Sequence, residues 1–127
     1  MNQENDRLSH ALLYASYGWP VLPMPTSDGN GGCSCSRTDC GSIAKHPRTR
    51  HGLNDATTDK DVIEKWWAHE YPDANIGVLV GEESGLLVLD IDPRNGGNES
   101  LDALLDGNKL PRTIETATGG GGRHILF

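Results

Sequence analysis

Long apolar runs are missing from this chain of 127 residues: no stretch approaches the roughly 20 apolar residues that a membrane-spanning helix needs. The basic and apolar regions of a secretory signal peptide are also missing, because residues 1–7 are polar and acidic. With 35% hydrophobic and 23% charged residues, the composition is that of a globular protein rather than a disordered one. We therefore expect one soluble, cytoplasmic domain without a membrane partner.

Basic residues are few: 11 Lys and Arg stand against 18 Asp and Glu, and the net charge is −7. A basic surface over the whole chain is thus excluded, and any nucleic-acid surface must be local. Residues 33–53 are the exception, because four basic residues and one acid give this segment +3 and leave −10 for the remainder. The basic residues are Arg37, Lys45, Arg48 and Arg50. Charge alone also fits an ordinary solvated loop, so both interpretations stay open.

Cysteine is scarce and odd in number, which argues against a disulfide framework in a reducing compartment. The three cysteines are Cys33, Cys35 and Cys40, and His46 follows them. Three thiolates and an imidazole are the donor set of a tetrahedral zinc site. The spacing therefore predicts a zinc loop with His46 as the fourth ligand. His51 is a less favoured fourth ligand, and free reduced cysteines are the alternative.

Hydrophobic periodicity predicts helices and strands in mixed order. Helices are expected at 6–17, from about Thr58 to Pro72, and at 99–105; strands are expected at 19–23, 75–80, 86–92, 113–118 and 123–127. Too few residues separate 75–80 from 86–92 for a crossover helix, so these two strands are expected to form a hairpin. The fold class is therefore α/β (α+β), mixed or antiparallel.

Two further segments lie outside this regular pattern. Residues 24–52 are long, polar and glycine-rich, so this loop needs its own means of staying ordered, which the zinc site would supply. On the second helix, Trp66 and Trp67 are adjacent, so we expect one of them in the core and the other over the edge of the sheet. Stacking on nucleic-acid bases is the alternative for this pair.

An apolar strand leads directly into Asp90-Ile91-Asp92. Residues two apart on a strand point to the same face, so Asp90 and Asp92 are expected to project together. Adjacent carboxylates repel unless a cation neutralises them, and Mg²⁺ or Mn²⁺ does so with oxygen ligands. The pair is therefore a candidate metal site. Two solvated aspartates at a strand end are the alternative.

A glycine run, residues 119–122, precedes Arg123 and His124. Glycines let a backbone approach a phosphate closely, and the next two side chains offer a charge and a hydrogen-bond donor. Arg123 and His124 are therefore candidate nucleotide-binding residues. On a strand they face opposite sides, and a flexible hairpin turn with His124 in the core is the alternative.

In order along nearly the whole chain, these motifs resemble the amino-terminal primase-polymerase domain of bifunctional replication proteins, within the archaeo-eukaryotic primase superfamily. The matching segments are Gly18–Pro23, Lys45-His46-Pro47, Ala56–Asp59, Trp66, Asn75–Val78, Gly85–Asp92, Leu110-Pro111 and Thr118–His124. The resemblance implies an RRM-like catalytic sheet within residues 75–127, an amino-terminal helix and strand extension, and a zinc-stabilised insertion at 24–52.

The resemblance also implies an activity: template-directed nucleotidyl transfer, as a DNA primase and DNA polymerase in phage, plasmid or integrated elements. Asp90 and Asp92 match the family's metal-binding acids, and His124 matches the small-x-His motif that contacts the triphosphate. Lys45 matches a lysine that would serve a phosphate. Implied partners are a single-stranded DNA template, nucleoside triphosphates and a helicase domain downstream in the full-length protein.

One family element has no counterpart: a third acid, on a strand beyond the His motif. The sequence stops within an apolar run at Phe127, so we expect a carboxyl-terminally incomplete domain that is inactive by itself. Two functions of other kinds compete with the primase interpretation. They are an Asp-x-Asp sugar-nucleotide transferase and a non-catalytic, zinc-containing nucleic-acid-binding module.

Overall fold

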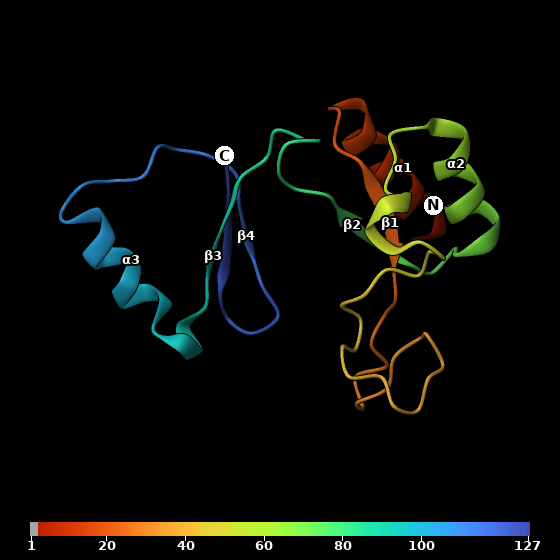
Figure 1. Ribbon diagram of the computed structural model, residues 1–127, viewed down its shortest axis with the longest axis horizontal. Helices are drawn as coiled ribbons and strands as arrows, with labels where there is room; N and C mark the ends of the chain where they lie inside the picture. Colours follow the sequence, from red (N-terminus) through yellow and green to blue (C-terminus); the bar gives the residue numbers. More distant parts are fainter. Residues whose placement is uncertain (1–2) are drawn as a thin grey trace. The chain divides into compact units, whose positions relative to one another are not determined.

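The computed structural model describes residues 3–127. They form two compact units, one that ends at Leu79 and one from Val80 to Phe127. Both combine helices with a small antiparallel sheet, so the mixed α+β class is confirmed (Figure 1). The first unit contains α1 (Gln3–Ser16), β1 (Val21–Met24), η1 (Gly52–Asp55), α2 (Lys60–Lys65), the π-helical η2 (Trp66–Glu70) and β2 (Asn75–Val78). The second contains β3 (Val88–Ile91), η3 (Pro93–Asn95), α3 (Gly97–Leu105), β4 (Glu115–Ala117) and β5 (Arg123–Leu126).

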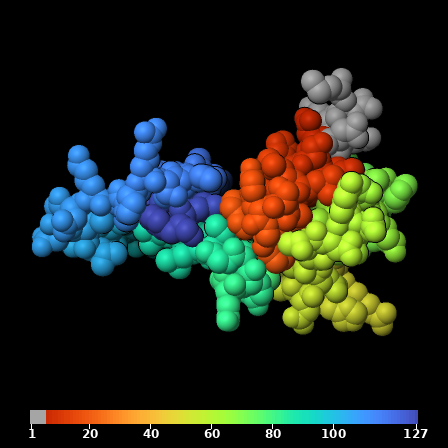
Figure 2. Space-filling model, turned by 90° about the horizontal axis from the view of Figure 1, so that it is seen from above, coloured from red at the N-terminus to blue at the C-terminus, as the bar shows by residue number. Residues whose placement is uncertain are grey.

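The core of the first unit forms where α1 and α2 meet the two-stranded sheet. β1 and β2 pair antiparallel from Val21 opposite Val78 to Met24 opposite Asn75. The space-filling view shows α1 directly against the segment of α2 (Figure 2). The buried residues that these elements share are Ala11, Val21, Leu22, Ile63, Trp66 and Trp67. The α2 helix begins where the Asp59 carboxylate accepts the Asp61 N–H, which satisfies one donor of its first turn.

Both adjacent tryptophans belong to this core. Trp66 is 8% and Trp67 is 1% exposed, and the Trp67 Nε1–H donates to the Ala74 carbonyl at 3.0 Å. The expectation that one of them covers the sheet edge is therefore wrong. Stacking on bases is excluded too, because neither ring face is open.

The second unit is a three-stranded antiparallel sheet in the order β3-β5-β4, with α3 against one face. That face buries Ile91, Ile125 and the α3 residue Leu101. The expected hairpin of 75–80 with 86–92 is wrong, because β2 pairs with β1 and β3 pairs with β5. Only the bridge between Gly81 and Leu86 closes the connection between them.

One close approach sets the distance between β3 and β5. A Cβ at Gly122 would overlap the carbonyl oxygen of Ile91, and it would lie 3.0 Å from the Thr118 hydroxyl. Only glycine therefore lets the start of β5 reach β3. Gly119, in the same turn, has open space around its Cβ position and no positive φ.

We predict that the core of the first unit depends on the indole of Trp67. Trp67→Phe removes the donor to Ala74 and leaves a buried carbonyl without a partner, which should lower the free energy of unfolding by about 2 kcal/mol. Tyr17, which is 56% exposed, is the matched control. Tyr17→Phe should change the free energy of unfolding by less than about 0.5 kcal/mol. Urea unfolding followed by circular dichroism measures both, and equal effects would contradict this account of the core.

We also predict that Gly122→Ala separates β5 from β3, whereas Gly119→Ala does not. The clash with the Ile91 carbonyl should cost about 2 kcal/mol, as overpacking in a tight site commonly does. This corresponds to roughly 30-fold faster amide hydrogen exchange in β5 if exchange follows opening of the sheet. Gly119→Ala should leave amide exchange in β5 nearly unchanged. Equal exchange rates in the two variants would show that the contact between Gly122 and the Ile91 carbonyl does not control the pairing of β5 with β3.

Candidate functional site

Four potential metal ligands meet in the loop between β1 and η1. One ligand atom each from Cys33, Cys35, Cys40 and His46 lies within 4.8 Å of every other. The loop turns sharply between them, since Ser36, at φ 64°, donates its N–H to the Cys33 carbonyl. The cluster that the spacing predicts is therefore formed, and its four donors could hold one metal ion.

Backbone contacts orient two of these ligands. The His46 Nδ1 lies 3.1 Å from the Pro47 carbonyl and donates to it, so that Nε2, 3.6 Å from the Cys33 Sγ, is left for a metal. The Ala44 N–H donates to the Cys33 sulfur at 3.4 Å. That hydrogen bond, followed by hydrogen bonds from the Cys35 backbone and from the Cys35 and His46 side chains, lowers the pKa of the Cys33 thiol to about 6. The pKa of His46 is raised, first by the Pro47 carbonyl and then by the Cys33 and Cys35 sulfurs, so metal binding would displace a proton.

His51 does not join the cluster. Its Nδ1 lies 3.4 Å from an Asp55 carboxylate oxygen, and its N–H donates to the other oxygen of the same carboxylate. The alternative with His51 as the fourth ligand is therefore wrong. Hydrogen bonding by the His51 N–H is the main reason that the pKa of Asp55 is lowered.

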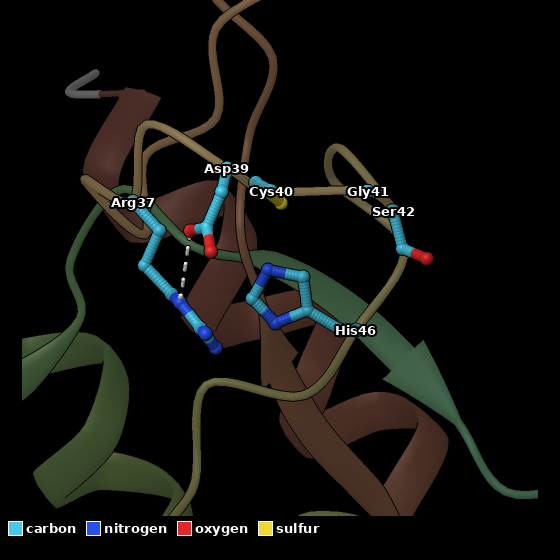
Figure 3. A pocket seen from close by; sticks show the side chains of 6 residues that line it. All are labelled: Arg37, Asp39, Cys40, Gly41, Ser42 and His46. Atoms are coloured by element: carbon cyan, nitrogen blue, oxygen red, sulfur yellow. Dashed lines mark ion pairs between the residues drawn. The ribbon is translucent and has the colours of Figure 1, made fainter.

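A hollow of about 270 Å³ opens beside the cluster (Figure 3). Cys40 and His46 line it, and so does an ion pair in which the Arg37 Nε lies 3.7 Å from an Asp39 oxygen. Two ligand side chains therefore face solvent on this side.

The basic residues of the loop have different surroundings. Arg37 is paired with Asp39, and the Arg48 guanidinium lies 4.9 Å from the centre of the Tyr71 ring. The Arg48 N–H donates to the Pro23 carbonyl, so this residue fastens the base of the loop to β1. Lys45 and Arg50 are exposed. Arg37 is exposed as well, at 73% of its side chain, but it is paired with Asp39.

Asp90 and His124 face each other across the central ladder of the second unit. They are directly opposed in the pairing of β3 with β5, and the His124 Nε2 lies 3.4 Å from an Asp90 oxygen. Thr116 of β4 is the next residue across. The side chains of Asp90 and His124 are 67% and 44% exposed, because α3 covers the other face. An aspartate and an imidazole therefore share an open sheet face.

Asp92 lies where β3 ends and η3 begins. Its backbone is extended, at φ −107° and ψ 105°, so the alternation that starts at Asp90 continues to it. One carboxylate oxygen accepts the Arg94 N–H at 3.0 Å, and the other accepts the Asn95 side-chain amide at 2.8 Å. Each oxygen keeps a free lone pair for a cation. The two aspartates and His124 are not, however, drawn together as a ligand cluster among the described residues.

Arg123 is on the opposite side of the sheet from His124. Its guanidinium pairs with the Glu115 carboxylate at 3.1 Å, next to the face that α3 covers. The structure thus brings Asp90 and His124 together and leaves Arg123 apart from them. Sequence reasoning missed Arg94 and Asn95, which contact Asp92; their only signal was their place directly after Asp92-Pro93.

None of the helices in the described residues combines the length and apolar character that crossing a membrane requires. Comparison with protein families matches residues 11–127 to the bifunctional DNA primase/polymerase amino-terminal domain. Comparisons with curated proteins and with solved structures give no match. The family match takes in both units, the Cys and His cluster, Asp90, Asp92 and His124. The chain therefore belongs to the bifunctional DNA primase/polymerase amino-terminal family.

Proposed function

We propose that the chain carries the catalytic face of a template-directed nucleotidyl transferase. Such an enzyme adds nucleotides from nucleoside triphosphates to the 3′ end of a strand paired with single-stranded DNA and releases pyrophosphate. The observation that carries the proposal is the opposition of Asp90 and His124 on an open sheet face, in a member of the primase/polymerase family. A sugar-nucleotide transferase would not account for the family match. The exposure of both side chains leaves them accessible to a substrate.

The arrangement of the second unit supports an RRM-like catalytic sheet. The order along the chain is strand, helix, strand, strand, and β5 lies between β3 and β4. The helix covers one face, so substrates have access to the other. In this proposal the acids lie at the carboxyl end of β3 and the imidazole lies near the start of β5, at the same end of the sheet.

The residues fit a divalent cation chemically, because Asp90 and Asp92 offer carboxylate oxygens and Asp92 is oriented by Arg94 and Asn95. Mg²⁺ or Mn²⁺, when bound, supplies charge that activates the attacking 3′-hydroxyl and stabilises the leaving pyrophosphate. Asp90 and Asp92 hold this charge in place. His124 donates a hydrogen bond to a phosphate oxygen. Lys45, in the first unit, is exposed and is proposed separately to serve a phosphate.

In the full-length protein, we predict that Asp90→Asn or Asp92→Asn abolishes nucleotide incorporation. Each substitution removes a negative charge that would hold the metal ion, and the metal ion stabilises the transition state by several kcal/mol. The rate of incorporation should therefore fall by about a thousandfold or more. His124→Ala should mainly raise KM, by roughly 10- to 100-fold, because it removes one hydrogen bond to a charged group. Primer extension with dTTP on an oligo(dA) template and Mn²⁺ measures these effects, alongside equilibrium binding of dTTP.

Asp102→Asn is the control, since Asp102 is an exposed acid on α3, and it should behave as the unmodified chain. The proposal fails if the unmodified chain binds no dTTP in the presence of Mn²⁺. It also fails if both aspartate variants bind dTTP and Mn²⁺ as tightly as the control does.

We further propose that Cys33, Cys35, Cys40 and His46 bind one Zn²⁺ as a structural site. Three thiolates and an imidazole suit tetrahedral zinc, and the Pro47 carbonyl holds His46 in the tautomer that zinc requires. Zinc would supply order in a loop that has few apolar residues to bury.

We predict that His46→Ala lowers zinc affinity by at least about tenfold and loosens the loop, while His51→Ala keeps zinc. The two histidines lie five positions apart in the same loop, and only His46 belongs to the cluster. Metal content by elemental analysis and zinc affinity by chelator competition measure the difference. Protein prepared without chelator that contains no zinc, or equal loss in the two variants, would refute the site.

A further inference from the structure

Arg94 is held beside the carboxylate that ends β3. Its N–H donates to one oxygen of Asp92, and its Nε lies 3.6 Å from the same oxygen. The side chain is 72% exposed. An exposed pair of this kind contributes little stability, so the guanidinium can be released to a stronger partner at small cost.

The same guanidinium lies against the glycine turn between β4 and β5. The ladder of β3 with β5 ends at Ile91 opposite Arg123; next to it, Gly122 lies against the Ile91 carbonyl and Gly120 lies near Arg94. A Cβ built at Gly120 would lie 2.5 Å from the Arg94 Nη2 and 2.9 Å from its Cζ. The Arg94 guanidinium therefore lies close to the Gly120 backbone.

The turn also offers backbone donors. The N–H groups of Gly121 and Gly122 donate to the carbonyl and the hydroxyl of Thr118, respectively. In the described part of the chain, no acceptor lies within hydrogen-bond distance of the N–H groups of Gly119 and Gly120. The same holds for both Nη groups of Arg94. The turn thus offers backbone donors close to the Arg94 guanidinium, and donors of this kind match the charge of an anion.

We propose that Arg94, with the N–H groups of Gly119 and Gly120, binds the outer phosphates of the nucleotide. The guanidinium presents a planar fork that matches two phosphate oxygens, which a lysine ammonium does not. Asp90 faces His124 and Arg94 faces Gly120, so the nucleotide would extend along this line past Asp92. The inference rests on the proposed function, because the phosphates are those of its nucleotide.

Binding measured by calorimetry at low salt tests the inference without turnover. One titration uses tripolyphosphate in the presence of chelator, and the others use dTTP and dTMP with Mn²⁺. Arg94→Gln should weaken tripolyphosphate and dTTP by roughly 10- to 100-fold, the effect of losing hydrogen bonds to a charged group. It should leave dTMP unchanged, because dTMP has no outer phosphates. Arg94→Lys should give an intermediate loss, because the charge stays and the fork is lost.

Arg112→Gln is the matched control, since Arg112 is an exposed arginine of the same unit. If Arg94 only neutralises Asp92, Arg94→Gln will bind tripolyphosphate and dTTP as the control does, and the inference is overturned. An equal loss for dTMP and dTTP also overturns it. If tripolyphosphate binding depends on Arg94 but the unmodified chain binds no dTTP, the proposed function fails while the anion contact stands. If neither compound binds, both are overturned.

Discussion

The approach of β5 to β3 is the constraint on which the candidate active site depends. Gly122 allows it, because any side chain there would meet the Ile91 carbonyl. Once the strands are in register, Asp90 lies opposite His124 and the glycine turn lies beside Arg94. A shift of one residue would move His124 to the face that α3 covers and replace it with Arg123 or Ile125. The position of one small residue, two before the histidine, thus fixes the chemistry of the open face.

Short-range sequence patterns predicted the open sheet face with Asp90 and His124 well. Strand alternation gave the separation of Arg123 from His124, and the glycine run gave the turn that joins β4 to β5. Helix positions followed from apolar spacing, with ends displaced by a few residues, as with α1, expected at 6–17 and observed over Gln3–Ser16. The Cys and His cluster followed from donor chemistry at short range. In each case the deciding interactions connect residues close in sequence or obey a strict period of two.

Pairing between distant segments was not predictable in this way. Residues 75–80 and 86–92 are near neighbours in sequence, yet β2 pairs with β1, more than fifty residues earlier, because their apolar residues complete the core with α1 and α2. The same core takes both Trp66 and Trp67, since the π-helical turn of η2 brings adjacent residues inward together. Arg94 was missed for a similar reason. It lies beside both Asp92 and Gly120, and the sequence does not place Gly120 near it.

The open sheet face of the second unit and the Cys and His cluster are stabilised in different ways. The sheet of the second unit is held by backbone pairing and by an apolar face of few residues, chiefly Ile91, Leu101 and Ile125, so its polar face can remain open. The loop between β1 and η1 has no such apolar face, and Arg48 on Tyr71 fastens only its base. Its turns, including the positive φ of Ser36 and Ala44, bring the three sulfurs together. Close thiolates repel one another, so a cation at their centre would both relieve that repulsion and fix the loop.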